Sequence, residues 1–166
     1  GANSGFGRVF TEFLIEKGEK VAATSRKVDG LNFITPSSNF LPLHFDMRDL
    51  DALPKAVNQV IDKWGRIDVL VNNAGYGLSG ALEELTEQQI ADQMNTNFTG
   101  LTMLTQAVLP HMRKKGSGYL VNFASVAGLR GWGGMSLYCA SKFAVVGLTE
   151  SLAQELEPFG IRASVV

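Results

Sequence analysis

Tyr138 and Lys142 carry the side chains with the clearest chemical potential in this sequence. They are four positions apart at the start of a long helical pattern, and positions i and i+4 share one face of a helix, so both side chains can reach the same small volume. An ammonium group beside a phenol stabilises the phenolate and so prepares the phenol for proton transfer. Ser125, thirteen residues before Tyr138, adds a hydroxyl. Together these side chains predict proton transfer at a carbonyl or alcohol oxygen.

Each of these residues taken singly has an ordinary structural interpretation. A tyrosine at a helix start usually packs its ring and leaves its hydroxyl in water, and a lysine one turn later is usually a surface charge. Cys139 is interpreted as a small helix residue, because no histidine lies near it in the sequence. His44 and His111 are interpreted as structural, and no metal-ligand spacing occurs, so no metal site is predicted. The chemical interpretation therefore depends on the rest of the chain.

A glycine-rich turn opens the chain and runs directly into an amphipathic pattern over residues 8–17. Backbone N–H groups at the start of a helix bind phosphate, and glycines let the phosphate come close. A turn with no binding role is the alternative. We expect the turn to hold a phosphate-bearing cofactor, and with the tyrosine and lysine this suggests hydride chemistry. The residues expected to do so are Gly1, Asn3, Ser4, Gly5, Phe6 and Gly7.

The end of the predicted strand at residues 20–25 bears on the type of cofactor. In a dinucleotide-binding unit an acidic residue here accepts a hydrogen bond from the ribose 2′-hydroxyl and would repel a 2′-phosphate. Ser25, Arg26 and Lys27 stand there instead. NADP(H) is therefore predicted in preference to NAD(H), with a charge-assisted contact from Arg26 to the 2′-phosphate. The alternative is that Arg26 and Lys27 are a solvated surface pair.

Short apolar runs alternate with helical patterns along the whole chain. This alternation predicts an α/β domain with a parallel sheet covered by helices on both faces. The loops that follow parallel strands meet at one edge of the sheet, and Ser125 follows such a strand. Residues 28–39 are predicted to be an irregular connection, and Thr86 to Gln89 have the spacing of a capping box. Strands are expected at 20–25, 40–45, 67–71, 119–123 and 161–166, and helices at 8–17, 50–64, 86–115 and 138–157.

Composition limits the kind of protein. The 166 residues are 45% apolar and 19% charged, which indicates one globular domain over residues 1–166. The net charge of −1, from 15 basic and 16 acidic residues, gives no electrostatic footprint for nucleic acid or an anionic membrane. The single cysteine cannot form an internal disulfide, and no run of about 18 apolar residues occurs. A cytoplasmic protein with small-molecule partners is expected.

Several motifs occur in a fixed order, and in combination the chain resembles the classical short-chain dehydrogenase/reductase (SDR) family from residue 1 to residue 166. A glycine turn or a tyrosine–lysine pair alone would be weak evidence, but the ordered set is specific. The motifs are the turn Gly1-x-x-x-Gly5-x-Gly7, the acidic Asp46, the tetrapeptide Asn72-Asn73-Ala74-Gly75, Asn97, Ser125 and Tyr138-x-x-x-Lys142.

The resemblance implies a Rossmann-type doubly wound parallel sheet and an NADP(H)-dependent oxidoreductase that interconverts a ketone or aldehyde and an alcohol by hydride transfer. Tyr138 would be the general acid or base, Lys142 would support it, and Ser125 would hold the substrate oxygen. Asn97 would support a water that leads protons to Lys142. Further cofactor contacts are expected from Ser25, Arg26, Asp46, Met47, Asn73, Ala74, Gly75, Tyr138 and Lys142.

The substrate side is predicted to be largely apolar, which favours an uncharged or weakly polar ketone or secondary alcohol. Residues 129–135 have an alternative interpretation as a hydrophobic loop that contacts a partner subunit. The family resemblance implies a homodimer or homotetramer, with the helices near residues 86–115 and 137–157 as candidate contacts. The residues predicted to line the substrate space are Leu78, Leu129, Trp132 and Met135.

The sequence departs from the family pattern at both ends. Family members normally have a strand before the glycine turn and a substrate-covering segment after the position of Val166, so the domain is expected to be truncated at both ends. The alternative function is a non-catalytic dinucleotide-binding sensor or scaffold, and a third interpretation is an inactive truncated product. The joint presence of Asn97, Ser125, Tyr138 and Lys142 favours the enzyme.

Overall fold

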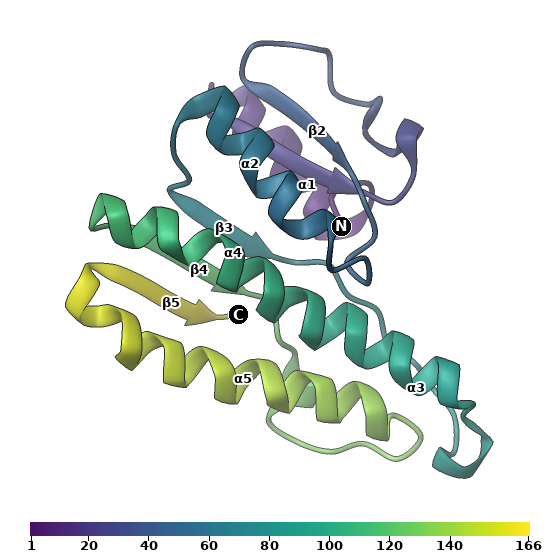
Figure 1. The fold of residues 1–166 in the computed structure, drawn as a ribbon. Coiled ribbons are helices and arrows are strands. Elements are labelled where there is room, and N and C mark those ends of the chain that lie inside the picture. The colour runs from purple at the N-terminus through teal and green to yellow at the C-terminus, as the bar shows by residue number, and fades with distance from the viewer.

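All strands run parallel, and their carboxyl ends point to the same side of the molecule (Figure 1). The computed structural model describes residues 1–166 apart from the side chain of Val28. Strand boundaries lie within two residues of the predicted ones, because short apolar runs covered on both faces are strong local signals. The strands are β1 (Val21–Ser25), β2 (Phe40–His44), β3 (Val69–Asn72), β4 (Gly118–Asn122) and β5 (Ile161–Val165).

Helices lie on both sides of the strand layer, which confirms the predicted α/β, doubly wound class. In Figure 1, α1 lies behind β1 and β2, whereas α2, α4 and α5 lie in front. Residues 28–39, predicted to be irregular, begin with a 3₁₀ turn at Val28–Leu31. The helices are α1 (Gly5–Glu16), α2 (Ala52–Trp64), α3 (Glu87–Met94), α4 (Gly100–Lys115) and α5 (Ser136–Leu156).

The strands form two sheets, where the sequence predicted one. β1 pairs with β2, and β3, β4 and β5 pair in that order; among the described residues no strand pairs with the facing edges of β1 and β3. Ala2 contacts the β1 edge and Gly1 contacts the loop after β3. The Ala2 N–H donates to the Thr24 carbonyl at 2.8 Å, and the Asn73 side-chain amide donates to the Gly1 carbonyl at 3.1 Å. Gly1 therefore lies at the carboxyl ends of both β1 and β3.

An apolar groove of about 230 Å³ runs between α1 and β3. Phe6 and Val9 on α1 are 79% and 65% exposed, and Phe10 and Phe13 beside them are also exposed. Val71 of β3 lines the opposite wall. The division of the sheet thus leaves a helix face and two strand edges without a covering element among the described residues.

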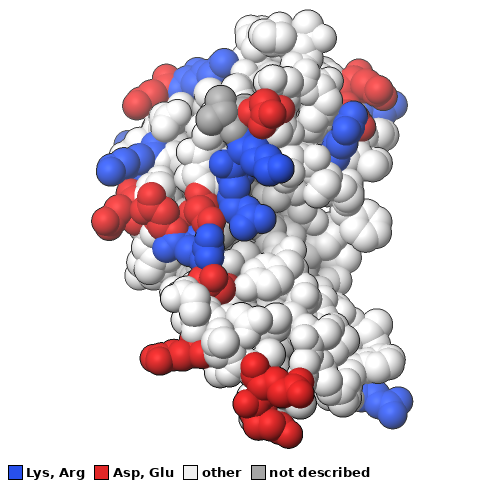
Figure 2. Space-filling view, turned by 90° about the vertical axis from the view of Figure 1, so that its right-hand side faces the viewer, with Lys and Arg blue, Asp and Glu red and all other residues white. Residues whose placement is uncertain are grey.

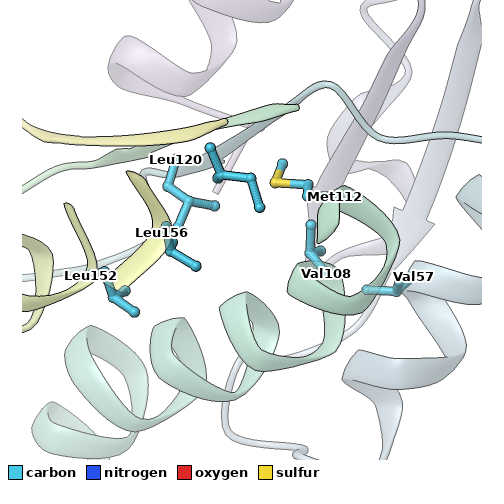
Figure 3. Packing of buried hydrophobic residues seen from close by; sticks show 7 residues of the cluster. Val57, Val108, Met112, Leu120, Leu152 and Leu156 are labelled. Atoms are coloured by element: carbon cyan, nitrogen blue, oxygen red, sulfur yellow. The ribbon is translucent and has the colours of Figure 1, made fainter. Parts of the chain in front are cut away.

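The largest core cluster holds α4 and α5 against β4 and β5. Figure 3 shows side chains from α2, α4, β4 and α5 converging in it. Burial of a leucine-sized side chain contributes about 1.5–3 kcal/mol, so this cluster fixes both helices firmly. Its buried members are Val57, Val108, Met112, Leu120, Leu152, Leu156 and Ile161. The elements that carry residues 97, 138 and 142 are therefore anchored far from the strand ends.

The helix predicted over residues 86–115 is divided by a π-helical turn, η3 (Asn95–Thr99). Its start is as predicted: the Thr86 hydroxyl accepts from the Gln89 N–H, and the Gln89 side chain accepts from the Thr86 N–H, which is a capping box. A π turn inserts an extra residue and redirects the side chains within it. Here the redirected residue is Asn97. Among the described residues, no helix has the length and apolar character to cross a membrane.

Candidate active site

The predicted functional residues gather at the carboxyl edge of the strands. Ser25 ends β1, Asp46 follows β2, Asn73 follows β3 and Ser125 follows β4. In an open α/β sheet this edge is where ligands bind. Figure 2 shows this side of the molecule, with Lys and Arg side chains intermixed with acidic ones across its middle.

The glycine turn at the start of the chain has no room for a side chain at Gly7. A Cβ on Gly7 would overlap the Gly1 carbonyl oxygen and would lie 2.7 Å from the Asn73 side-chain nitrogen. Gly5 has φ +53°, a left-handed conformation that favours glycine. Among the described residues, the Ser4 side chain makes no cap hydrogen bond to α1, so it does not occupy the N–H groups of the first turn. This arrangement fits a phosphate group.

The structure places Ser25 inside its loop. Ser25 is only 2% exposed, and its hydroxyl oxygen accepts from the Lys27 N–H at 3.1 Å. Gly30 packs so closely on it that a Cβ there would overlap the Ser25 hydroxyl. Arg26 is exposed at the tip of this loop. The exposed guanidinium, more than the serine hydroxyl, is therefore available to a ligand.

Asp46 and Met47 lie at the start of the loop after β2. Arg48 donates to the Asp46 carboxylate, and this contact lowers the pKa of Asp46 below its ordinary value of 3.8. Met47 is buried, and its carbonyl oxygen lies so close to Gly100 that a Cβ on that glycine would overlap it. The acidic group stays ionised at neutral pH in a fixed loop.

Asn97 lies at the centre of a buried hydrogen-bond network. It is 1% exposed; its side-chain oxygen accepts from the Tyr76 N–H at 3.0 Å, and its amide donates to the Tyr76 carbonyl at 2.9 Å and to the Ser141 hydroxyl at 3.1 Å. Ser141 in turn donates to the Tyr138 carbonyl at 2.7 Å. The segment after β3 and the start of α5 are thus tied together through one amide.

Lys142 is buried with its ammonium group directed at the same space. It is 6% exposed, and its Nζ donates to the Phe123 carbonyl at 2.8 Å. Burial lowers the pKa of Lys142 from its ordinary value of 10.5. The Nζ lies 5.8 Å from the centre of the Tyr138 ring and 3.7 Å from the Cβ position at Gly75. The lysine and tyrosine therefore share one volume, as their spacing predicts.

Ser125 lies on the turn that packs against α5. Its hydroxyl oxygen accepts from the Ala127 N–H at 3.1 Å and so begins the 3₁₀ turn Val126–Gly128. A Cβ on Gly128 would lie 2.9 Å from the Lys142 carbonyl oxygen, so a glycine lets this turn approach α5 closely. The serine and the tyrosine–lysine helix are thereby held side by side.

Of the residues predicted for substrate, Met135 lies with Tyr138 beside Gly77. The Met135 methyl carbon and the Tyr138 ring both lie within 3.7 Å of the Cβ position at Gly77. Leu78 is half-buried on the same loop, whereas Leu129 and Trp132 are 74% and 51% exposed. The structure therefore brings one predicted lining residue to the tyrosine and leaves two on the surface.

Sequence reasoning missed three side chains that shape this site. Arg48 bonds Asp46, Ser141 links Asn97 to Tyr138, and Gln93, which is fully buried, donates to the Tyr76 carbonyl at 2.9 Å. Gln93 precedes Asn97 by four positions, so the two amides share a helix face. That spacing, two amides on one face, was the available signal.

The chain matches the family model described as short chain dehydrogenase over residues 1–166. It belongs to the short-chain dehydrogenase family. The resemblance identified from the ordered motifs is thereby confirmed.

Individual relatives show the same family. The chain is 43% identical, over its full length and 60% of the relative's length, to 3-ketodihydrosphingosine reductase of Bacteroides thetaiotaomicron. The chain is 44% identical, over 79% of its own length and 39% of the relative's length, to human 17-beta-hydroxysteroid dehydrogenase type 1. Among solved structures, ElxO with NADP bound superposes with a TM-score of 0.92 at 32% identity, covering 99% of this chain and 69% of that one. The chain thus spans about 60% of the length of the first two curated relatives it matches.

Proposed function

We propose that the protein is an NADP(H)-dependent oxidoreductase that interconverts a ketone or aldehyde and an alcohol, with Tyr138 as the general acid or base. The observation that carries this proposal is the buried connection from Tyr76 through Asn97 and Ser141 to Tyr138, with the Lys142 ammonium beside it. The hydrogen bonds of this connection end on the Tyr138 backbone carbonyl, and the buried Lys142 ammonium beside the Tyr138 ring is the feature that a purely structural helix start would not need. Relatives described as reductases and dehydrogenases support the same reaction class.

Each residue of the site has a separate role in the proposed reaction. In reduction the Tyr138 hydroxyl gives its proton to the carbonyl oxygen, and in oxidation its phenolate takes the alcohol proton. The positive charge of Lys142 stabilises that phenolate, and the Ser125 hydroxyl holds the substrate oxygen. When bound, the nicotinamide supplies or accepts the hydride. Lys142 would also hold the nicotinamide ribose, and Gly1 to Gly7 would hold the phosphates.

Tyr138→Phe tests the role of the tyrosine. The change removes the proton donor and keeps the ring, so carbonyl reduction by the full protein should fall roughly 10²–10⁴-fold. NADPH binding, measured by fluorescence titration, should persist. Full turnover in the variant would exclude Tyr138 as the acid. Absence of turnover in the unmodified protein across a carbonyl panel, with NADPH still bound, would favour the sensor or scaffold instead.

Arg26→Ala tests the preference for NADP(H). A charge-assisted hydrogen bond contributes about 1.5–3 kcal/mol, so loss of the guanidinium should raise the KM for NADPH about tenfold or more and leave that for NADH nearly unchanged. The structure of a relative with bound NADP supports this preference. Lys27→Ala, one position along the same exposed loop, is the matched control. Equal effects of Arg26→Ala on both cofactors would refute the assignment.

The substrate is proposed to be a small, mostly apolar carbonyl or alcohol compound. Met135 supplies an apolar wall near Tyr138, and Leu78 and the exposed Leu129 and Trp132 would add to it by folding over bound substrate. The assembly is proposed to be a homodimer or homotetramer through α4 and α5, where Phe143 is 47% exposed. Light scattering on the full protein measures the subunit number.

A further inference from the structure

Gln93 on α3 is a fully buried polar side chain with no direct part in the reaction steps proposed for this site. It is 0% exposed, and its Nε2 donates to the Tyr76 carbonyl oxygen at 2.9 Å. The reverse orientation of the amide would place two oxygens against each other, so the nitrogen faces Tyr76. Glutamine is seldom buried completely, because its amide must then find partners within the protein. Its burial here therefore requires a reason other than packing.

Two side-chain amides bind the backbone of Tyr76. Its carbonyl oxygen accepts from Gln93 and also from the Asn97 Nδ2 at 2.9 Å, which uses both lone pairs of that oxygen. The Tyr76 N–H donates to the Asn97 Oδ1 at 3.0 Å. The orientation of the Asn97 amide is thus set by the Tyr76 backbone, and Gln93 supplies the remaining restraint on that backbone.

The Asn97 amide transmits this restraint to α5. Its Nδ2 also donates to the Ser141 hydroxyl at 3.1 Å, and Ser141 donates to the Tyr138 carbonyl at 2.7 Å. Tyr138 lies in the first turn of α5, which begins at Ser136. The first turn of a helix has fewer internal hydrogen bonds than its middle. The position of Tyr138 therefore depends on contacts from outside the helix, and this chain of hydrogen bonds supplies one.

The Gln93 amide can be removed without leaving another protein group unpaired. Its Oε1 is buried and accepts no hydrogen bond from the described residues, so no protein donor depends on it. The Tyr76 carbonyl would keep its hydrogen bond from Asn97. Methionine is also long and unbranched, and it fills such a space without a polar amide. Replacement of a buried polar group is nearly neutral for stability when no partner is left unsatisfied. Stability therefore gives little reason for an amide at this position.

We propose that Gln93 is a positioning residue for the proposed reaction. It fixes the Asn97 amide through the Tyr76 carbonyl. That amide, through Ser141, holds the first turn of α5, which presents Tyr138. The inference rests on the proposed function, since it requires that Tyr138 exchanges a proton with a substrate. A small misplacement of a reacting group can lower the rate by up to about 10²-fold, so a restraint three contacts away is sufficient to affect turnover.

Gln93→Met in the full protein tests this role, and Gln88→Met is the matched control, because Gln88 is exposed on the same helix. The assay is NADPH-dependent reduction of the most reactive compound in a panel of aliphatic ketones, aryl ketones and aldehydes. In Gln93→Met, kcat should fall about tenfold. The NADPH Kd, from fluorescence titration, should change less than about twofold, and the melting temperature without cofactor should stay within about 5 °C. The control should match the unmodified protein in all three measurements.

A Ser141→Ala background separates transmission through the hydrogen bonds from an effect by another route. In that background Gln93→Met should lower kcat by less than about threefold, because residues in one network are not additive. An unchanged kcat in Gln93→Met, or an undiminished loss in the Ser141→Ala background, would overturn the inference while the proposed function stands. A fall in melting temperature of more than about 5 °C would assign Gln93 to stability and overturn it as well. No turnover by the unmodified protein with any compound of the panel would overturn both.

Discussion

At the scale of single residues, Lys142 shows what burial does to a charged side chain. Lys142 is 6% exposed, and among the described residues its ammonium group has a single protein acceptor, the Phe123 carbonyl at 2.8 Å. Desolvation disfavours the charged form and lowers its pKa. A bound ribose or a tyrosine phenolate would return favourable partners to the charge. The charged form of Lys142 would therefore have more favourable partners with cofactor bound than without it.

This burial predicts a pH dependence of cofactor binding. The charged form of Lys142 is the one that attracts phenolate and ribose oxygens, and its fraction falls as pH rises through a pKa below 10.5. NADPH affinity should therefore weaken as pH rises, with the decline beginning before pH 10.5. Titrations from neutral pH upward measure this, and Lys142→Met should give a weaker, flat profile. An unmodified protein whose affinity stays constant to pH 10.5 would contradict the assignment.

At the scale of elements, the entry into α4 depends on close backbone contact. Gly100 begins α4 against the Met47 carbonyl oxygen, so the loop that holds Asp46 rests directly on the helix. Any side chain at this position would push the loop away. The loop after β2 is therefore in direct backbone contact with the start of α4, next to the π turn.

Gly100→Ala should destabilise the protein by about 1–3 kcal/mol, because overpacking against backbone forces a shift. Gly147→Ala is the matched substitution: Gly147 is exposed in the middle of α5, and nothing lies within 4 Å of a Cβ there. Alanine is the better helix former, so this change should stabilise by about 0.5–1 kcal/mol. Urea denaturation measures both. Equal stability changes at the two sites would show that the contact with Met47 carries no strain.

At the scale of the whole molecule, the edges of β1 and β3 face each other beside an apolar groove. Two strand edges face each other without a partner among the described residues, and exposed Phe6, Val9 and Phe13 line the groove beside them. Unpaired edges and apolar grooves promote association. Gly1 lies where both strands end, so an extended segment that leads into it runs parallel to both.

An engineered extension of about five β-branched, apolar residues ahead of Gly1 should enter this groove and raise the melting temperature of the 166-residue chain by more than about 5 °C. The reason is that it would pair with both edges and cover α1. A matched extension with prolines at alternate positions lacks the N–H donors for that pairing and should have little effect. Differential scanning calorimetry measures both. Equal shifts would show that the gain is hydrophobic and not due to strand pairing.

The sequence by itself determined the features that depend on near neighbours. The capping box from Thr86 to Gln89, the left-handed glycine that ends α2 at Gly65 and the shared face of Tyr138 and Lys142 are all set within a few positions of chain. Hydrogen bonds and periodicity of that range do not require the rest of the fold. The order of strands and helices, and hence the shared edge of the functional loops, follows from the same local patterns.

Only the tertiary structure decided which distant groups meet. The Asn97 amide reaches Ser141 across 44 positions, Arg48 reaches Asp92 on another element, and the Lys142 ammonium finds the carbonyl of Phe123. The π turn that orients Asn97 and the packing of Gly30 on Ser25 are likewise features that the tertiary structure shows. Such contacts are selected by packing, because a buried polar group takes whichever partner the assembled elements bring within reach.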